Sequence, residues 1–245
     1  MNNKTCNQKG FSLTELSVVI IIMALIIASV MTGSSLMERA KIRGVIAEVT
    51  NHKLAVNSFN AKFDYYPGDF NESSEYWSGS IDGNGDGNIE FVSGGVYEGY
   101  LAWQNLAYAK MTNNPFVGTR TDGIAQVGID IPESRTGGGY FFEYESHGFS
   151  GRNNLVLGLP LNIGASDTNL TVNGILTPDQ AFEVDSKMDD GSPISGNVRG
   201  QDGENSTAES CINLNPDNDA LTINDDIYAL DEEGTDCTIA FIATN

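Results

Sequence analysis

The sequence predicts an α+β protein in which one long N-terminal helix leads into a globular head with a small antiparallel sheet. Three observations predict it. Residues 16–31 are apolar except for two serines. Apolar positions then recur at helical spacing as far as residue 63, which extends the helix well beyond the apolar run. Short runs rich in β-branched and aromatic residues follow in the distal part of the chain and predict strands.

The apolar run is the first element of the chain. Together with residues 11–13, residues 16–31 are long enough to cross a bilayer as a helix. Glu15 lies near the start of this run. A charge inside hydrocarbon costs roughly 2.5–3.5 kcal/mol even on lenient insertion scales. Glu15 therefore either lies at the membrane interface or has a partner charge or a functional role.

A short basic leader precedes the apolar run. It has ten residues, carries Lys4 and Lys9, and ends at Gly10. An ordinary secretory signal has its small-residue cleavage site after the hydrophobic region, and no comparably clean site follows residue 31. The apolar segment is therefore expected to stay on the mature protein.

These N-terminal residues resemble a known signal. Residues 9–15 (KGFSLTE) followed by an apolar helix are similar to the class III signal of type IV prepilins and type II secretion pseudopilins. The resemblance implies cleavage between Gly10 and Phe11 by a prepilin peptidase/methyltransferase, N-methylation of Phe11, and assembly into a filament with other pilin or pseudopilin subunits. It also implies that the Glu15 carboxylate neutralises the terminal ammonium of a neighbouring subunit. Two opposite charges in a low dielectric attract strongly, whereas either alone is costly.

The long helix is expected to continue beyond the membrane. One helical face carries apolar residues as far as Phe63, and Pro67 is expected to end the element. A helix over residues 11–63 would be about 80 Å long, so its first half needs lipid or other copies of itself. The face consists of Ile42, Val45, Val49, Val56, Phe59 and Phe63.

The expected domain plan has four parts. Residues 1–10 form a leader that is removed, 11–32 a transmembrane helix, 33–66 the periplasmic half of the long helix, and 67–245 an acidic α+β head. The location implied by the resemblance is the bacterial inner membrane, with a single span and the head in the periplasm. The mature protein would then enter an extracellular pilus or a periplasmic pseudopilus.

The charge is distributed unevenly along the chain. The net charge is −20; residues 1–62 hold seven Lys/Arg against three Glu, and residues 63–245 hold six against thirty Asp/Glu. The head is therefore strongly acidic and self-repelling. Because phosphate contacts require Lys/Arg clusters, direct nucleic-acid binding is not expected.

The sequence has no pattern that indicates an enzyme. It contains no phosphate loop, HExxH or GxSxG motif. Its two histidines, His52 and His147, are expected at a hydrophilic helix position and in a turn, without a triad or metal context. A structural protein is therefore predicted.

Three cysteines are consistent with an exported protein. Cys6 lies in the leader, which leaves Cys211 and Cys237 as an even pair. A bridge would close a loop of about 27 residues, worth on the order of 3.5 kcal/mol. The exported setting favours a disulfide over two unlinked thiols, and the resemblance to pilins implies a disulfide-bounded C-terminal region.

An Asp/Asn-rich loop at residues 82–90 is a candidate Ca²⁺ site. Oxygen-bearing side chains at alternate positions and a glycine at the sixth match the first part of an EF-hand-like loop. The twelfth position is Ser93 instead of a bidentate Glu, and Glu98 is the candidate substitute. The alternative is a Gly/Asx turn without metal. The candidate ligands are Asp82, Asn84, Asp86, Asn88 and Glu90.

The remainder predicts short strands and two further helices. Strands are expected at residues 139–145, 154–161 and 237–244, and a helix at 98–111. A second helix should begin after a Thr177 cap and stop at Gly191, with a loop from 191 to 210. The acidic residues at the end of that helix indicate either a second cation site or a solvated helix end. They are Asp185, Asp189 and Asp190.

These patterns together predict a structural subunit, minor or specialised, of a type IV pilus-like filament. It would polymerise through its N-terminal helix, with Glu15 pairing with the Phe11 amine of a neighbour. One alternative is a type II secretion pseudopilin. The other is a single-pass anchored calcium-binding domain that does not polymerise, which would keep an uncut N-terminus.

Overall fold

The computed structural model describes residues 12–92, 96–118, 125–161, 172–204, 206, 210–213 and 227–244. The chain divides into two compact units, Met1–Lys41 and Ile42–Asn245. The predicted cleavage site between Gly10 and Phe11, the leader cysteine Cys6 and the loop residue Ser93 lie outside the described residues.

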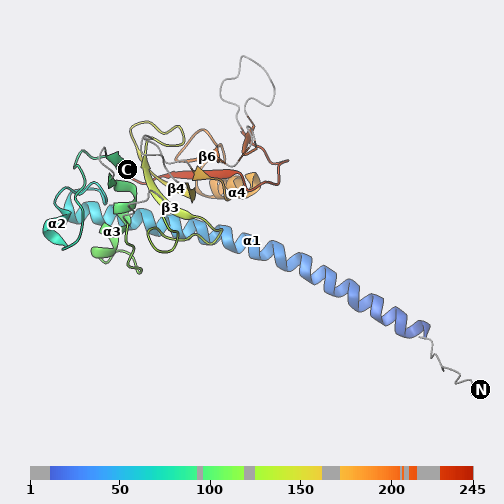
Figure 1. Ribbon diagram of the computed structural model, residues 1–245. Helices are drawn as coiled ribbons and strands as arrows, with labels where there is room; N and C mark the ends of the chain where they lie inside the picture. Colours follow the sequence, from blue (N-terminus) through green and yellow to red (C-terminus); the bar gives the residue numbers. More distant parts are fainter. Residues whose placement is uncertain are drawn as a thin grey trace, which may run out of the picture. The chain divides into compact units, whose positions relative to one another are not determined.

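The helix α1 runs from Leu13 to Phe63 (Figure 1). In the first unit, every side chain of α1 that the structure describes is exposed. The segment Leu13–Val30 is long and apolar enough to cross a membrane, and none of it is buried within the protein. Exposed apolar surface of this extent requires lipid or another protein around it.

In the second unit, α1 carries the apolar stripe that the sequence predicts. Five of its six positions are completely buried, and Phe63 is half-buried. The helix ends there because Asp64 takes a left-handed conformation, with φ 62°, shortly before Pro67. The buried positions are Ile42, Val45, Val49, Val56 and Phe59.

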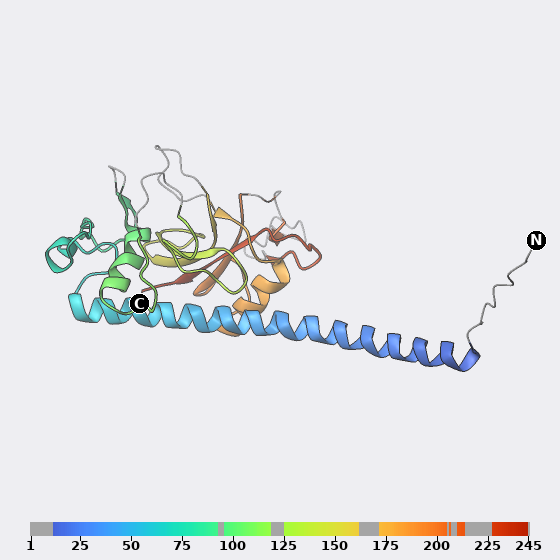
Figure 2. The same ribbon diagram turned by 60° about the horizontal axis from the view of Figure 1, so that its bottom comes forward.

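An antiparallel five-stranded sheet forms the centre of the head (Figures 1 and 2). The strand order is β3-β4-β9-β6, and β5 pairs with β4. The three strands expected from the sequence are β3, β4 and β9, so the α+β prediction is confirmed. The bounds are β3 Gly139–Tyr144, β4 Asn153–Pro160, β5 Val172–Asn173, β6 Val198–Asp202 and β9 Cys237–Ile242.

The prediction of a continuous loop from 191 to 210 is wrong, because β6 lies within it. This strand pairs along its whole length with β9, from Val198 opposite Phe241 to Asp202 opposite Cys237. Its residues, VRGQD, have weak strand propensity by themselves. The strand forms because β9 offers it a ladder of backbone hydrogen bonds, which is a tertiary effect that no local pattern contains.

The two helices expected in the head lie where the sequence predicts them. The helix α3 begins at Glu98 as expected but ends at Tyr108, three residues early, and Lys110 then takes φ 58°. The helix α4, Pro178–Met188, has the predicted capping box between Thr177 and Gln180. Besides β5 and β6, five further short elements were not expected from the sequence. They are α2 Ser73–Tyr76, β1 Phe91–Val92, β2 Val96–Tyr97, β7 Ile212–Asn213 and β8 Ile227–Tyr228.

A disulfide joins Cys211 to Cys237, with a Cα–Cα distance of 4.9 Å. Both residues are completely buried. The bridge ties the segment before β7 to the first residue of β9, and Asp202 of β6 accepts a hydrogen bond from the Cys211 amide at 2.6 Å. The predicted pairing is therefore present, and it joins the last strand to the preceding loop region.

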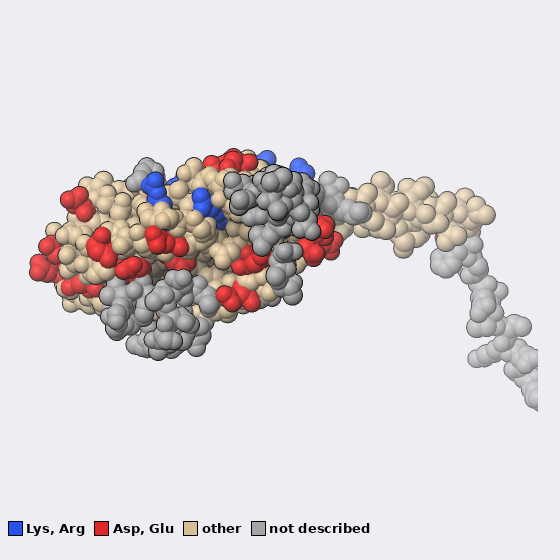
Figure 3. Space-filling model, turned by 90° about the horizontal axis from the view of Figure 1, so that it is seen from above, with Lys and Arg blue, Asp and Glu red and all other residues tan. Residues whose placement is uncertain are grey.

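The surface of the head agrees with the uneven charge of the sequence. Figure 3 shows Asp and Glu side chains spread over one face of the head, with few Lys and Arg among them. Of the ion pairs between described residues, Arg135–Glu48 (3.1 Å) and Lys187–Glu183 lie in the head. Most of the acidic charge is therefore not matched by basic side chains within the head.

Candidate functional sites

Glu15, the predicted assembly residue, caps its own helix. Its Oε2 atom accepts a hydrogen bond from the Ser12 amide at 3.0 Å, and the Ser12 hydroxyl accepts one from the Glu15 amide at 3.2 Å. These reciprocal bonds form a capping box, which satisfies two amides at the start of α1. The Ser-x-x-Glu spacing at residues 12–15 is the signal in the sequence that indicates this role.

The capping box leaves Glu15 without an opposite charge. Its side chain is exposed, and it makes no ion pair with any residue that the structure describes. A carboxylate in this place remains costly in hydrocarbon, because hydrogen bonds to amides do not cancel its net charge. The arrangement is compatible with a cation supplied from outside the described chain.

The Asp/Asn-rich loop is folded by side-chain to backbone hydrogen bonds. Asp82 accepts bonds from the amide and the hydroxyl of Ser74, at 2.7 and 2.8 Å, so both of its oxygens already have donors. Asn84 and Asp86 form successive Asx turns, each accepting from the amide two residues on, at 3.0 and 2.9 Å. These are the hydrogen bonds expected of a Gly/Asx turn without metal, the alternative to a Ca²⁺ site.

Two buried carboxylates hold this loop. Asp69, 1 % exposed, accepts from the amides of Asp86 and Gly87 at 2.9 and 3.0 Å. Glu98, completely buried, accepts from the amides of Asn84 and Glu90 at 2.8 and 3.1 Å. Hydrogen bonds from backbone amides to an ionised carboxylate are stronger than hydrogen bonds between neutral groups. The expected reach of Glu98 to the loop is thus present, but its oxygens bind backbone amides.

A third side chain fixes the loop to the sheet. Asn153, the first residue of β4, accepts from the Ile89 amide at 2.7 Å and donates to the Gly87 carbonyl at 2.9 Å. Ile89 is completely buried. Neither Asp69 nor Asn153 was singled out in the sequence, because nothing in the local pattern shows that residues so distant in sequence reach the loop.

Burial controls the protonation of the two carboxylates. Loss of hydration raises the pKa of Asp69 to about 6 and that of Glu98 to about 7, although the amide bonds oppose the change. The negative charge of Asp69 also raises the pKa of Glu98. Glu98 is therefore close to its titration point at neutral pH.

The acidic side chains of the 82–90 loop do not converge on one point in the part of the chain that the structure describes. In the part of the chain that the structure describes, the loop does not bring three acidic ligand atoms within 4.8 Å of one another. Calcium prefers six to eight oxygen ligands around one point. The loop fits the ion only in part, and Ser93, at the twelfth position, lies outside the described residues.

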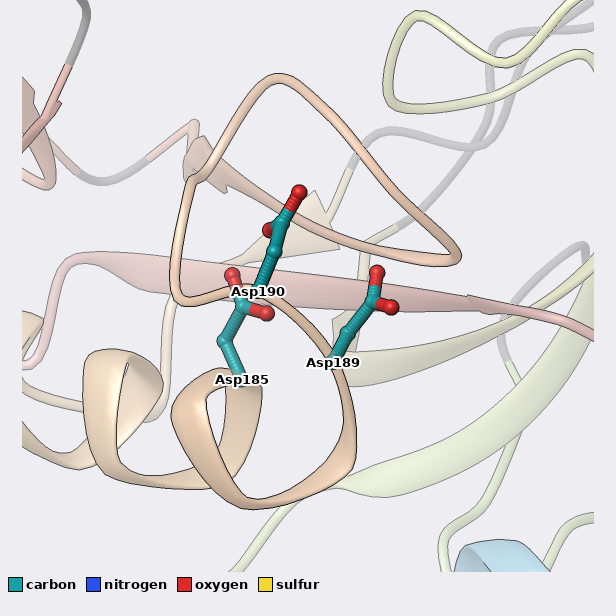
Figure 4. A group of neighbouring side chains, drawn as sticks. All are labelled: Asp185, Asp189 and Asp190. Atoms are coloured by element: carbon teal, nitrogen blue, oxygen red, sulfur yellow. The ribbon is translucent and has the colours of Figure 1, made fainter.

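Three acidic side chains do converge at the end of α4. Oxygens of Asp185, Asp189 and Asp190 lie within 4.8 Å of one another (Figure 4). Carboxylates at this spacing match the ligands of a hard cation. Asp185 is completely buried, and loss of hydration raises its pKa to about 6.

Each of the three acids also binds the surrounding backbone or side chains. Asp185 accepts from the Tyr228 hydroxyl at 2.9 Å and from the Gly191 amide at 3.2 Å. Asp190 accepts from Ser192 and Ser195, and Asp189 from the amides of Asn197 and Val198. The acids thereby hold the turn between α4 and β6, which accounts for their proximity without an ion.

The two histidines lie apart and serve packing. His52 contradicts the expectation of a hydrophilic helix position, because its ring packs edge-on against Trp103 and Tyr140, with centroids 4.8 and 4.9 Å away. It lines a cavity of about 850 Å³ beside α1, and burial lowers its pKa to about 4. His147 lies in a turn, with φ 53°, and its Nε2 atom is 2.8 Å from the Thr238 hydroxyl.

The comparisons with known proteins identify the N-terminal segment. Residues 5–31 match the family model of the prokaryotic N-terminal methylation motif, which is the class III signal of type IV pilins and pseudopilins. Searches of curated proteins and of solved structures gave no match. The resemblance found in the sequence is therefore confirmed for this segment.

We expect Glu98→Gln to change how the stability of the head depends on pH. The folded-state pKa of Glu98 is raised, so the stability linked to it is fully present below about pH 4 and is lost as the pH rises through about 7. Glutamine does not titrate. Denaturant unfolding of the full-length protein should therefore show that the wild type loses stability relative to E98Q between pH 4.5 and 7.5.

The matched control for this variant is Glu72→Gln, at an exposed position beside α2. Its stability difference from the wild type should not vary with pH over the same range. If the difference in unfolding free energy between E98Q and the wild type stays constant over this pH range, the raised pKa of Glu98 is contradicted.

Proposed function

We propose, from the class III signal carried by residues 5–31, that this protein is a structural subunit of a type IV pilus-like filament. The signal supports a type IV pilin-like or pseudopilin-like protein, and the family of such proteins is structural rather than enzymatic. The finer proposal is that a prepilin peptidase cuts after Gly10 and methylates Phe11, and that the subunit is a minor or specialised one.

The exposed first half of α1 supports assembly. Every residue of Leu13–Val30 lacks cover within the protein. In the inner membrane lipid surrounds this segment, and in a filament outside the membrane only other copies can replace the lipid. The head would lie in the periplasm, where its disulfide is chemically stable.

Glu15 is the residue that we propose makes the contact between neighbouring membrane helices specific. Cleavage after Gly10 would create an ammonium group at Phe11, and the Glu15 carboxylate of a neighbouring subunit would neutralise it. Both charges are costly alone in hydrocarbon, so each favours the arrangement in which they meet. The capping box holds the carboxylate in place at the start of the helix, so pairing requires no reordering of Glu15.

The processing step is tested by mass spectrometry of the protein purified from its membrane. We expect the chain to begin at an N-methylated Phe11, with residues 1–10 removed. The control is Gly10→Val, which places a branched side chain at the cut and should leave the leader attached. A wild-type protein that keeps Met1 would contradict the filament proposal and favour an anchored domain that does not polymerise.

Two substitutions separate the charge of Glu15 from its capping role. Glu15→Gln keeps an oxygen that can accept from the Ser12 amide but removes the charge, whereas Glu15→Ala removes both. We expect both variants to be cut normally and to form filaments with a yield lower by on the order of tenfold or more, as the cost of an unpaired membrane charge implies. Normal filament yield from E15Q would show that capping alone is sufficient.

A type II secretion pseudopilin is the second candidate, because pseudopilins share the class III signal that residues 5–31 carry. The abundance of the protein in filaments sheared from cells distinguishes the candidates. A major pilin dominates such material, a minor pilin is present at a low level, and a pseudopilin stays in the cell envelope.

Calcium binding by loop 82–90 is a separate proposal. Its support is the alternation of Asp and Asn oxygens and Gly87 at the sixth position, with φ 94°. Binding to the folded state alone would raise the unfolding temperature of the head in millimolar Ca²⁺ relative to a chelator. Asp86→Asn should reduce that increase, and an unchanged unfolding temperature would refute the proposal.

A further inference from the structure

A hollow of about 340 Å³ lies on the sheet between the turn that follows β3 and the end of β6. Four carboxylates line it, two from each side, and no Lys or Arg does. Arg199 of β6 does not line the hollow, but its guanidinium is bound beside it, 2.6 Å from the carbonyl of the lining residue Gly148 and over the Phe149 ring. The carboxylates are Glu143, Glu145, Asp202 and Glu204.

The wall of the hollow contains an acceptor without a donor. The Thr238 hydroxyl donates to the Gln201 carbonyl at 3.1 Å, so it accepts from His147 Nε2. The other ring nitrogen, Nδ1, then carries a lone pair, and it is buried without a partner among the described residues. A buried acceptor that lacks a donor is destabilising. The hollow therefore carries excess negative charge, and one of its lining residues holds a buried acceptor without a donor.

The spacing of the carboxylates favours an organic cation over a metal ion. Metal ligands must converge on one point, and the described residues contain one such acidic group, Asp185 with Asp189 and Asp190, which lies outside this hollow. A guanidinium or ammonium group carries several N–H donors and a spread charge, so it can bind carboxylates that do not converge. The hollow is therefore suited to an Arg or Lys side chain.

The chain itself carries basic side chains of this kind. Arg39, Lys41 and Arg43 lie within five residues on α1, and all three are exposed. None of them forms a hydrogen bond or ion pair with a described residue. We call these three residues the basic segment. The protein has a net charge of −20, and the basic segment is the densest group of positive charge in its sequence.

The basic segment begins beyond the lipid headgroups. Arg39 lies nine residues beyond Val30, the end of the candidate span, which is about 14 Å along the helix axis. The headgroup layer extends only about 5–8 Å beyond the hydrocarbon, and charges in solution are screened over about 8 Å. An acidic protein surface is thus a better partner for the basic segment than lipid headgroups.

We propose that the acidic hollow of one copy binds the basic segment of a second copy. This inference rests on the proposed assembly and adds a contact between head and helix to the contact between membrane helices. Opposite charges at defined places would offset the repulsion between acidic heads and would fix which copies can be neighbours.

Zero-length cross-linking of carboxylates to amines tests the contact directly. Full-length protein made in ¹⁴N medium and full-length protein made in ¹⁵N medium are mixed in detergent, reconstituted into one membrane and treated with a carbodiimide. We expect a cross-link between Lys41 of one isotope and Glu145 or Glu204 of the other. Cross-links from Lys41 to these residues within a single isotope only, or only to acids that do not line the hollow, would overturn the proposal.

Charge reversal provides the second test. The variant E145K/E204K should reduce the filament yield by about tenfold, which corresponds to a loss of 1.4 kcal/mol per contact. Adding K41E/R43E to the same chain should restore the yield. The control E72K/E75K reverses two exposed acids at α2, outside the hollow, and should assemble normally. Because lysine at 145 loses the acceptor for the Gly151 amide, E145Q/E204Q is a milder variant that should reduce yield to a smaller extent.

The outcomes separate this inference from the proposed function. If the wild type assembles and E145K/E204K assembles equally well, the contact is wrong while the filament proposal stands. If wild-type copies do not associate with one another, the contact is overturned, whereas the filament proposal is overturned only if the wild type is also absent from filaments. Loss of assembly that K41E/R43E fails to restore would also overturn the contact.

Discussion

The constraint on which this structure depends is that one helix needs two different surroundings. Beyond Ile42, α1 buries its apolar stripe against the sheet and α3, and this stripe is the base of the hydrophobic core. Before Lys41, none of its side chains that the structure describes is covered within the protein. A chain built this way cannot satisfy its whole hydrophobic surface alone, because burial of the first half requires lipid or other proteins.

The polar interior of the head is organised around buried carboxylates. Asp69 and Glu98 collect four loop amides, and Asp185 joins the turn after α4 to β8 through Tyr228. Loops that lack a hydrophobic side are thereby fixed to the core through hydrogen bonds. An acidic composition thus serves the fold as well as the surface.

The sequence predicted those features that are encoded locally. The apolar stripe, the Thr177 cap and three strands each depend on neighbouring residues, the cysteine pair follows from the number of cysteines, and the structure contains all of them. The strand β6 and the roles of Asp69 and Asn153 depend on partners distant in sequence. The Ca²⁺-like spacing predicted a loop correctly but could not show that Ser74 already donates to Asp82.

The Ser12–Glu15 capping box fixes the first residue of the helix. A cut after Gly10 would leave only Phe11 ahead of the cap, so the new terminus would have almost no free length. The depth of the terminal charge in the bilayer would then be set by the rigid helix to within about one residue, or roughly 1.5–3.5 Å. Subunits that share this cap would all present their charges at the same level, which is the geometric condition for a repeating lattice.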